Sequence, residues 1–154
     1  MPPLTPEQIA FLEGPNSLVI ATQDGNLVPE VTRGLALRCQ GDGRVLVWLP
    51  ARIASRAAAN LKVEPRIAVG VSRPSSHQTF QLKGRAVKVA EAAPEVQATL
   101  EQAFAAYIQE VGAVGMPARF LEPVVRWPLL EILVEVSEIY DQTPGPGAGE
   151  KCPS

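Results

Sequence analysis

Short apolar segments rich in β-branched residues, separated by turn signals, run through most of this chain. Ser17–Thr22 (SLVIAT) ends at Asp24-Gly25, and Gly41-Asp42-Gly43 precedes Arg44–Leu49 (RVLVWL). Such segments, bounded by Gly, Asp and Pro, are typical of β-strands. Six segments fit this pattern: Ser17–Thr22, Val28–Arg38, Arg44–Leu49, Arg66–Ser72, Thr79–Ala90 and Leu129–Tyr140.

Three other segments favour helix. Near the N-terminus, Thr5 is a candidate N-cap, Pro6 fits the first helical position, and Gln8 can complete a capping box. The alanine-rich segment Ile53–Lys62 and the segment Pro94–Gln109 also have helical composition or spacing. Strands and helices do not alternate as they do in a doubly wound sheet. The pattern therefore predicts a mainly β domain, a six-stranded antiparallel barrel with attached helices.

The length of 154 residues favours a single domain, which we place at residues 1–142. Residues 143–154 (TPGPGAGEKCPS) are rich in Pro and Gly, and we expect a disordered tail there. The sequence shows neither a signal peptide nor an apolar run long enough to span a bilayer. Cys39 and Cys152 lie far apart in the sequence. We expect a soluble, cytoplasmic protein with reduced cysteines and no membrane partner.

The charges exclude several classes of function. The chain has 14 Lys and Arg against 16 Asp and Glu, without the clustered basic charge of a nucleic-acid-binding protein. Its single histidine, His77, lies in a polar loop and cannot form a metal site alone, so we expect no metal. Walker A, GxGxxG and G-x-S-x-G motifs are also missing. A bound phosphate would have to be held in another way.

Four arginines near predicted strand ends are the remaining candidates for ligand binding: Arg33, Arg52, Arg56 and Arg66. Arg52 and Arg56 lie around the start of the alanine-rich helix, beside Ser55. A helix N-terminus offers free N–H groups and a partial positive charge, and guanidinium groups add bidentate contacts to phosphate. The same spacing also fits arginines that only face solvent. The residues alone leave both interpretations open.

Four pieces of the chain, in order, resemble a known family. They are Ser17–Pro29 with its Asp-Gly turn, Arg44–Pro65, Thr79–Arg85 (TFQLKGR), and Arg126–Thr143 with a tryptophan at its start. The second piece carries Ser55-Arg56-Ala57, Asn60-Leu61 and Glu64-Pro65. Together they resemble the pyridoxamine 5'-phosphate oxidase-like family of FMN-binding split barrels, from about Leu12 to Gln142.

The resemblance implies that FMN binds at the interface of a homodimer. It assigns the phosphate to Arg52, Ser55 and Arg56, and a polar contact with the ring to Gln81. Trp127 of a second copy would shield the ring, although a core or interface aromatic residue fits this position equally well. Residues from the second and third predicted strands would border the ring and ribityl chain: Thr32, Arg33, Leu49, Pro50 and Ala51.

Two departures from the family pattern bear on function. The lysine of the family's S-R-K motif is Ala57 here, which removes one phosphate contact. True pyridoxamine 5'-phosphate oxidases end in an arginine-x-histidine substrate motif, whereas no histidine follows His77 in this chain. We therefore do not expect the vitamin B6 reaction.

The resemblance leaves three functions to compare. The first is an FMN-dependent oxidoreductase of unknown substrate, in which the cofactor carries the redox chemistry. The second is a flavin carrier or electron-transfer module without an organic substrate. The third keeps the fold but binds heme or a deazaflavin, and heme would require an axial ligand that only His77 could supply as a histidine. The sequence favours the first.

Overall fold

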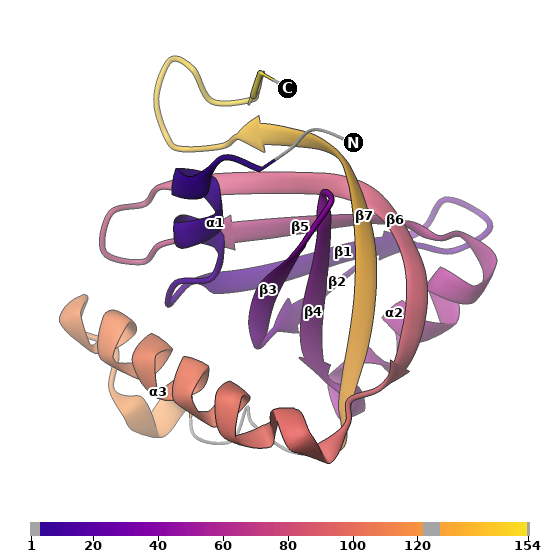
Figure 1. The fold of residues 1–154 in the computed structure, drawn as a ribbon, viewed down its shortest axis with the longest axis horizontal. Coiled ribbons are helices and arrows are strands. Elements are labelled where there is room, and N and C mark those ends of the chain that lie inside the picture. The colour runs from indigo at the N-terminus through magenta and orange to yellow at the C-terminus, as the bar shows by residue number, and fades with distance from the viewer. Residues whose placement is uncertain (1–3, 122–126, 154) are drawn as a thin grey trace.

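The computed structural model describes residues 4–121 and 127–153, which form a strongly curved antiparallel sheet with helices around it (Figure 1). The strands are β1 Ser17–Gln23, β2 Pro29–Gly34, β3 Ala36–Gly41, β4 Arg44–Pro50, β5 Arg66–Ser72, β6 Thr79–Glu91, β7 Leu129–Asp141 and β8 Glu150–Lys151. The helices are α1 Pro6–Leu12, α2 Ala51–Val63 and α3 Gln97–Ala113, with 3₁₀ turns η1 Pro94–Val96 and η2 Ala118–Phe120.

The strand order β2-β1-β5-β6-β7-β4-β3 explains the shape of the sheet. β2 and β3 are consecutive in the chain yet lie at opposite ends of this order. Only Leu35 separates them, and its N–H donates to the carbonyl of Trp48 over 2.8 Å. The two edges of the sheet therefore meet at one point, while the rest stays open. This confirms the predicted mainly β antiparallel fold of the split-barrel type.

The predicted strand count of six was wrong, because the described residues contain eight strands. The segment Val28–Arg38 forms two strands rather than one bent strand. β2 pairs with β1, and β3 pairs with β4. The change of partner occurs directly after Gly34, where a Cβ atom would lie 2.8 Å from the Cβ of Leu18. A glycine allows this close approach of two strands.

The period-two pattern of the strands positions the core. In β1, Leu18, Ile20 and Thr22 are buried while the residues between them are half-buried, as expected when alternate side chains face opposite sides of a sheet. The main core fills the inside of the curved sheet. A second, smaller cluster lies beneath α3 and is formed by Leu35, Ala36, Trp48, Ala92, Leu100 and Leu129.

The helices begin where local signals predict. The N–H of Gln8 donates to Thr5 Oγ1 over 3.2 Å, and the N–H of Thr5 donates to Gln8 Oε1 over 2.9 Å, so the predicted capping box is confirmed. α2 begins at Ala51, two residues before the predicted start. α1 and α3 lie on one side of the sheet and α2 on the opposite side (Figure 1). No helix in the two described ranges combines the length and apolarity needed to cross a membrane.

The tail differs from the expectation of disorder. Its residues 150–151 form β8, which pairs with β7 through Tyr140 and Asp141. The N–H of Cys152 donates to the carbonyl of Ile139 over 2.8 Å, and the Cys152 side chain packs against the main core. The Pro- and Gly-rich composition predicted disorder, whereas main-chain pairing with the free edge of β7 gives the segment a defined place.

Candidate functional site

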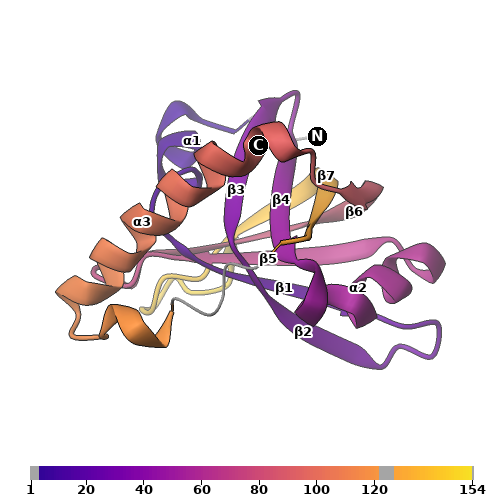
Figure 2. The ribbon, with the colours of Figure 1, turned by 90° about the horizontal axis from the view of Figure 1, so that it is seen from below.

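A pocket of about 450 Å³ lies where the ends of β2 and β4 meet the start of α2. α3 and Leu121, the residue after η2, contribute its opposite side. α3 runs diagonally past β3 in Figure 2. This volume is in the usual range for small-molecule sites. The described residues that line it are Asn16, Leu18, Arg33, Gly34, Leu35, Pro50, Arg52, Ile53, Phe104, Tyr107 and Leu121.

Arg33 reaches this pocket because of the alternation in β2. The side chain of Thr32 points inward, where its hydroxyl donates to the carbonyl of Ile53 over 3.2 Å and ties β2 to the first turn of α2. Arg33 therefore faces the other side of the strand. Its guanidinium donates to Ser17 Oγ over 3.1 Å and to the Tyr107 hydroxyl over 3.4 Å. Both partners are neutral, so these contacts leave the positive charge of Arg33 uncompensated.

The first turn of α2 forms the second positive part of the pocket. Pro50 is the N-cap residue, and no side chain caps this end of the helix. The N–H of Ala51 donates to the carbonyl of Pro128 over 3.0 Å, whereas the next N–H groups of a first turn have no partner within the helix. Arg52 stands in this turn and also lines the pocket. The helix dipole and the guanidinium both favour an anion here.

The charges of the pocket have one sign. Among the described lining residues the charged side chains are Arg33 and Arg52, and none is a carboxylate. The remaining lining is largely apolar. Aliphatic and aromatic side chains come from the β2–β3 junction, α2, α3 and the residue after η2: Leu35, Ile53, Phe104, Tyr107 and Leu121. The pocket can therefore hold a molecule that combines an anionic group with an apolar body.

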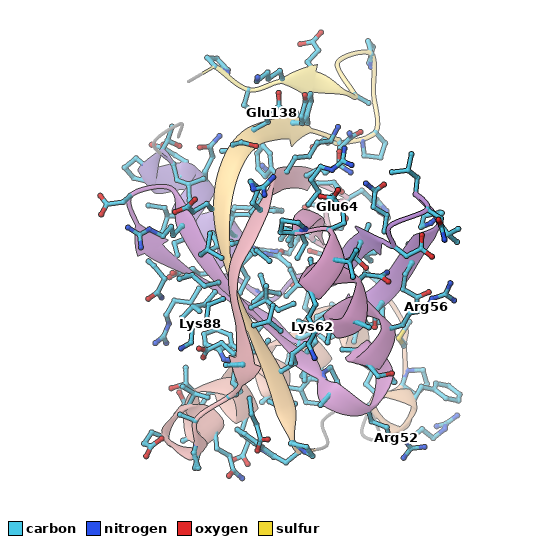
Figure 3. The ribbon with its side chains drawn as sticks, turned by 90° about the vertical axis from the view of Figure 1, so that its right-hand side faces the viewer. Arg52, Arg56, Lys62, Glu64, Lys88 and Glu138 are labelled. Carbon is cyan, nitrogen blue, oxygen red and sulfur yellow. The ribbon has the colours of Figure 1, made fainter. Side chains whose placement is uncertain are left out.

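Two of the predicted phosphate contacts, Ser55 and Arg56, lie further along α2 and do not line the pocket. Arg56 forms an ion pair with Glu30 of β2 at 3.5 Å, and its side chain is 58% exposed. Figure 3 shows Arg52 and Arg56 on the same side of α2. This agrees with their spacing of four residues, which places both on one helix face.

The other predicted site residues lie elsewhere. Leu49 is fully buried in the main core, and Ala51 is half-buried at the start of α2. Gln81 lies on β6, where its side-chain oxygen accepts from Gln142 over 3.5 Å. Trp127 packs against the smaller core cluster beneath α3. Of the ten predicted residues, the structure brings Arg33, Pro50 and Arg52 together in the pocket, with Thr32 supporting them from inside.

Sequence reasoning missed three polar or aromatic residues of the pocket. The helical spacing of Pro94–Gln109 indicates only that Phe104 and Tyr107 share the apolar side of a helix, not that they line a pocket. Asn16 is buried, and its side-chain oxygen accepts from Nε of Arg73 over 2.7 Å. No local signal identifies Asn16. A tyrosine within an otherwise apolar helical stripe was the available signal for Tyr107, because a phenol hydroxyl requires a polar partner when it is buried.

A second hollow of about 620 Å³ lies on the outer side of β1, β5, β6 and β7. Its charged residues already have partners in several cases: Arg66 contacts Glu64 at 3.0 Å, and Glu138 contacts Lys151 at 2.8 Å. These contacts lower the pKa of Glu64 and of Glu138, so both carboxyl groups are ionised at neutral pH. The hollow thus mixes both signs of charge, and we regard the smaller pocket as the better ligand site.

The sequence profile of the family described as pyridoxamine 5'-phosphate oxidase matches residues 4–129. The chain belongs to this family. Membership agrees with the fold, but the family name does not specify the reaction of this member. A comparison with curated proteins gives no match.

Solved structures of other proteins share the family fold. An F420 reductase has a TM-score of 0.57 and 13% identity, over 84% of this chain and 93% of that one. A candidate pyridoxamine 5'-phosphate oxidase from Lactobacillus delbrueckii has a TM-score of 0.57 and 16% identity, over 90% and 93%. An FMN-binding protein from Syntrophomonas wolfei has a TM-score of 0.51 and 13% identity, over 80% and 74%. Identities this low show a common fold alone.

Proposed function

We propose that this chain binds FMN in the pocket between β2, α2 and α3 and acts as an FMN-dependent oxidoreductase. One observation carries the proposal: Arg33 and Arg52 are the charged side chains among the described pocket residues, and they face an apolar wall beside an uncapped helix start. FMN has the matching chemistry, since a phosphate is joined to a planar and largely apolar ring system. Family membership supports a flavin ligand, and a neighbour in the fold is an FMN-binding protein.

The donor set of the pocket fits this ligand. Arg33, Arg52 and the first N–H groups of α2 would hold the phosphate, with Ser55 and Arg56 following on the same helix face. The apolar wall would receive the ring. A bound flavin would supply hydride and electron transfer, while the residues of this chain bind it, orient it and keep water from one side.

A second copy of the chain is part of the proposal. One row of small or apolar residues crosses β2, β1 and β5 on the outer side of the sheet. Figure 2 shows no helix beneath β2. Val31, 62% exposed, pairs with Ala21, which pairs in turn with Ala68. Arg33 points to the same side of β2 as Val31. A homodimer that covers this face would therefore place a partner beside the pocket, within reach of Gln81 on β6.

The reaction is not expected to be that of the family name. Pyridoxamine 5'-phosphate oxidation uses an arginine-x-histidine motif near the end of the chain, and no histidine follows His77 here. The proposal is therefore an oxidoreductase with another substrate. The F420 reductase among the fold neighbours makes a deazaflavin the competing cofactor.

Affinity for FMN and for riboflavin, which lacks the phosphate, tests the proposed site. We expect Arg52→Ala to weaken FMN binding about tenfold to a hundredfold, because a charge-assisted hydrogen bond contributes about 1.5–3 kcal/mol. Riboflavin binding should stay unchanged in this variant. Arg38→Ala is the matched control, since Arg38 is exposed on β3 and does not line the pocket. The measurement is a fluorescence titration of each variant with both ligands.

The titrations distinguish a wrong ligand from a wrong position of the phosphate. Wild-type protein that binds neither FMN nor riboflavin would exclude FMN as the ligand, and a titration with F420 or heme would then identify the alternative. If Arg56→Ala weakens FMN binding while Arg52→Ala does not, the phosphate lies beside Glu30 rather than in the pocket.

A further inference from the structure

One stripe of side chains along α3 is buried at both ends but only half-buried in the middle. Leu100, Phe104, Tyr107 and Val111 follow at spacings of four, three and four residues, which places them on one face of the helix. Leu100 and Val111 are each only 2% exposed, so both ends of the stripe are buried in protein. Phe104 and Tyr107 are only half-buried, and both line the pocket. Phe104 also packs against the smaller core cluster, but the middle of the stripe is less covered by protein than its two ends and faces the pocket.

α3 is held in place at both ends. Leu100 packs in the smaller core cluster with Leu35 and Trp48. Near the other end, the N–H of Ser75 in the β5–β6 loop donates to Glu110 over 3.0 Å. Hydrogen bonds from Ser75 lower the pKa of Glu110, so the carboxylate stays ionised at neutral pH and keeps this contact. These contacts fix the position of α3, and with it the positions of Phe104 and Tyr107 beside the pocket.

The two aromatic residues offer different contacts to a ligand in the pocket. The Tyr107 hydroxyl accepts from the guanidinium of Arg33 over 3.4 Å, whereas the Phe104 side chain has no polar group. The two ring centroids lie 6.5 Å apart with an interplanar angle of 42°. Because Ser17 holds another nitrogen of the same guanidinium, Tyr107 and Ser17 together fix the direction of Arg33.

We propose that α3 determines which ligand the pocket accepts, through two separate contacts. Phe104 packs against the ring system of the ligand, and Tyr107 is a positioning residue that orients Arg33 toward the anionic group. The preferred ligand is then a planar aromatic molecule with a phosphate or similar anion. This inference rests on the proposed flavin function. Arg33 and Arg52 account for binding of the anionic group, whereas α3 would select for the aromatic ring.

Titration of two variants with FMN and riboflavin tests the two contacts separately. Phe104→Ala should lower the affinity for FMN and for riboflavin by the same factor, about two- to tenfold, because it removes an aromatic contact with the ring that the two ligands share. Tyr107→Phe should lower the affinity for FMN by about two- to tenfold and leave the affinity for riboflavin unchanged. It removes the hydrogen bond between the Tyr107 hydroxyl and Arg33, the residue proposed to contact the phosphate. The unchanged riboflavin affinity also reports that this variant is folded.

Matched controls come from residues that do not line the pocket. Ile108→Ala removes a half-buried side chain from the same helix, and Tyr140→Phe removes a phenol hydroxyl from β7. Both should bind FMN like wild type. The inference is overturned if Phe104→Ala binds both ligands with wild-type affinity. It is also overturned if Tyr107→Phe loses the same factor of affinity for FMN and for riboflavin. The proposed flavin function stands in either case. Wild-type protein that binds neither ligand overturns both.

Discussion

At the scale of single residues, Gly84 and Gly112 differ in what a side chain would meet. At Gly84 a Cβ atom would overlap the carbonyl oxygen of Glu135 on the neighbouring strand β7, at a place where the pairing register of β6 shifts. At Gly112, near the end of α3, an added Cβ would meet no atom within 4 Å apart from the adjoining backbone of its own helix. One glycine is therefore required by packing between strands, whereas the other only costs helix stability.

We predict opposite effects for the two alanine substitutions. Gly84→Ala should lower the free energy of unfolding by about 1–3 kcal/mol, because the strands must move apart. Gly112→Ala should raise it by about 0.5–1 kcal/mol, since alanine is the better helix former. Urea unfolding of both variants measures the difference. A Gly84→Ala variant as stable as wild type would show that β6 and β7 are not as close at this point as the structure has them.

At the scale of elements, most strands and helices could be predicted from local patterns, because alternation and capping depend on neighbouring residues. The break of Val28–Arg38 into β2 and β3 could not, since it depends on which distant strand each half joins. The site shows the same limit. Arg52 was indicated by its place at a helix start, but Tyr107 meets Arg33 across a long stretch of sequence, and no local periodicity reports such a contact.

The paired tail should contribute to the stability of the fold. Deleting residues 143–154 removes β8, the hydrogen bond from the Cys152 N–H to Ile139, and the packing of Cys152 on the core. We expect a loss of about 1–2 kcal/mol, and hence a Tm lower by roughly 2–8 °C in a thermal melt. Lys151→Ala is the control, because its ion pair with Glu138 is exposed and should contribute little. An unchanged Tm after deletion would mean that the tail does not dock.

At the scale of the whole molecule, the proposal joins two surfaces. The pocket at the start of α2 and the uncovered row across β2, β1 and β5 adjoin at β2, where Arg33 and Val31 point to the same side. A ligand in the pocket would then lie next to the partner of a homodimer. Val31→Glu places a charge in the proposed interface, and because Val31 is 62% exposed in one chain, this change should leave the fold of the single chain intact.

Gel filtration of the protein mixed with FMN, with light scattering and flavin absorbance recorded together, tests whether the chain binds FMN as a homodimer. We predict one peak with about twice the 16.5 kDa mass of a single chain, carrying flavin in an amount equal to the chains. Val31→Glu should elute with the mass of one chain and carry less flavin. FMN that elutes apart from the wild-type protein would contradict flavin binding, and a single-chain mass with FMN still bound would contradict the dimer.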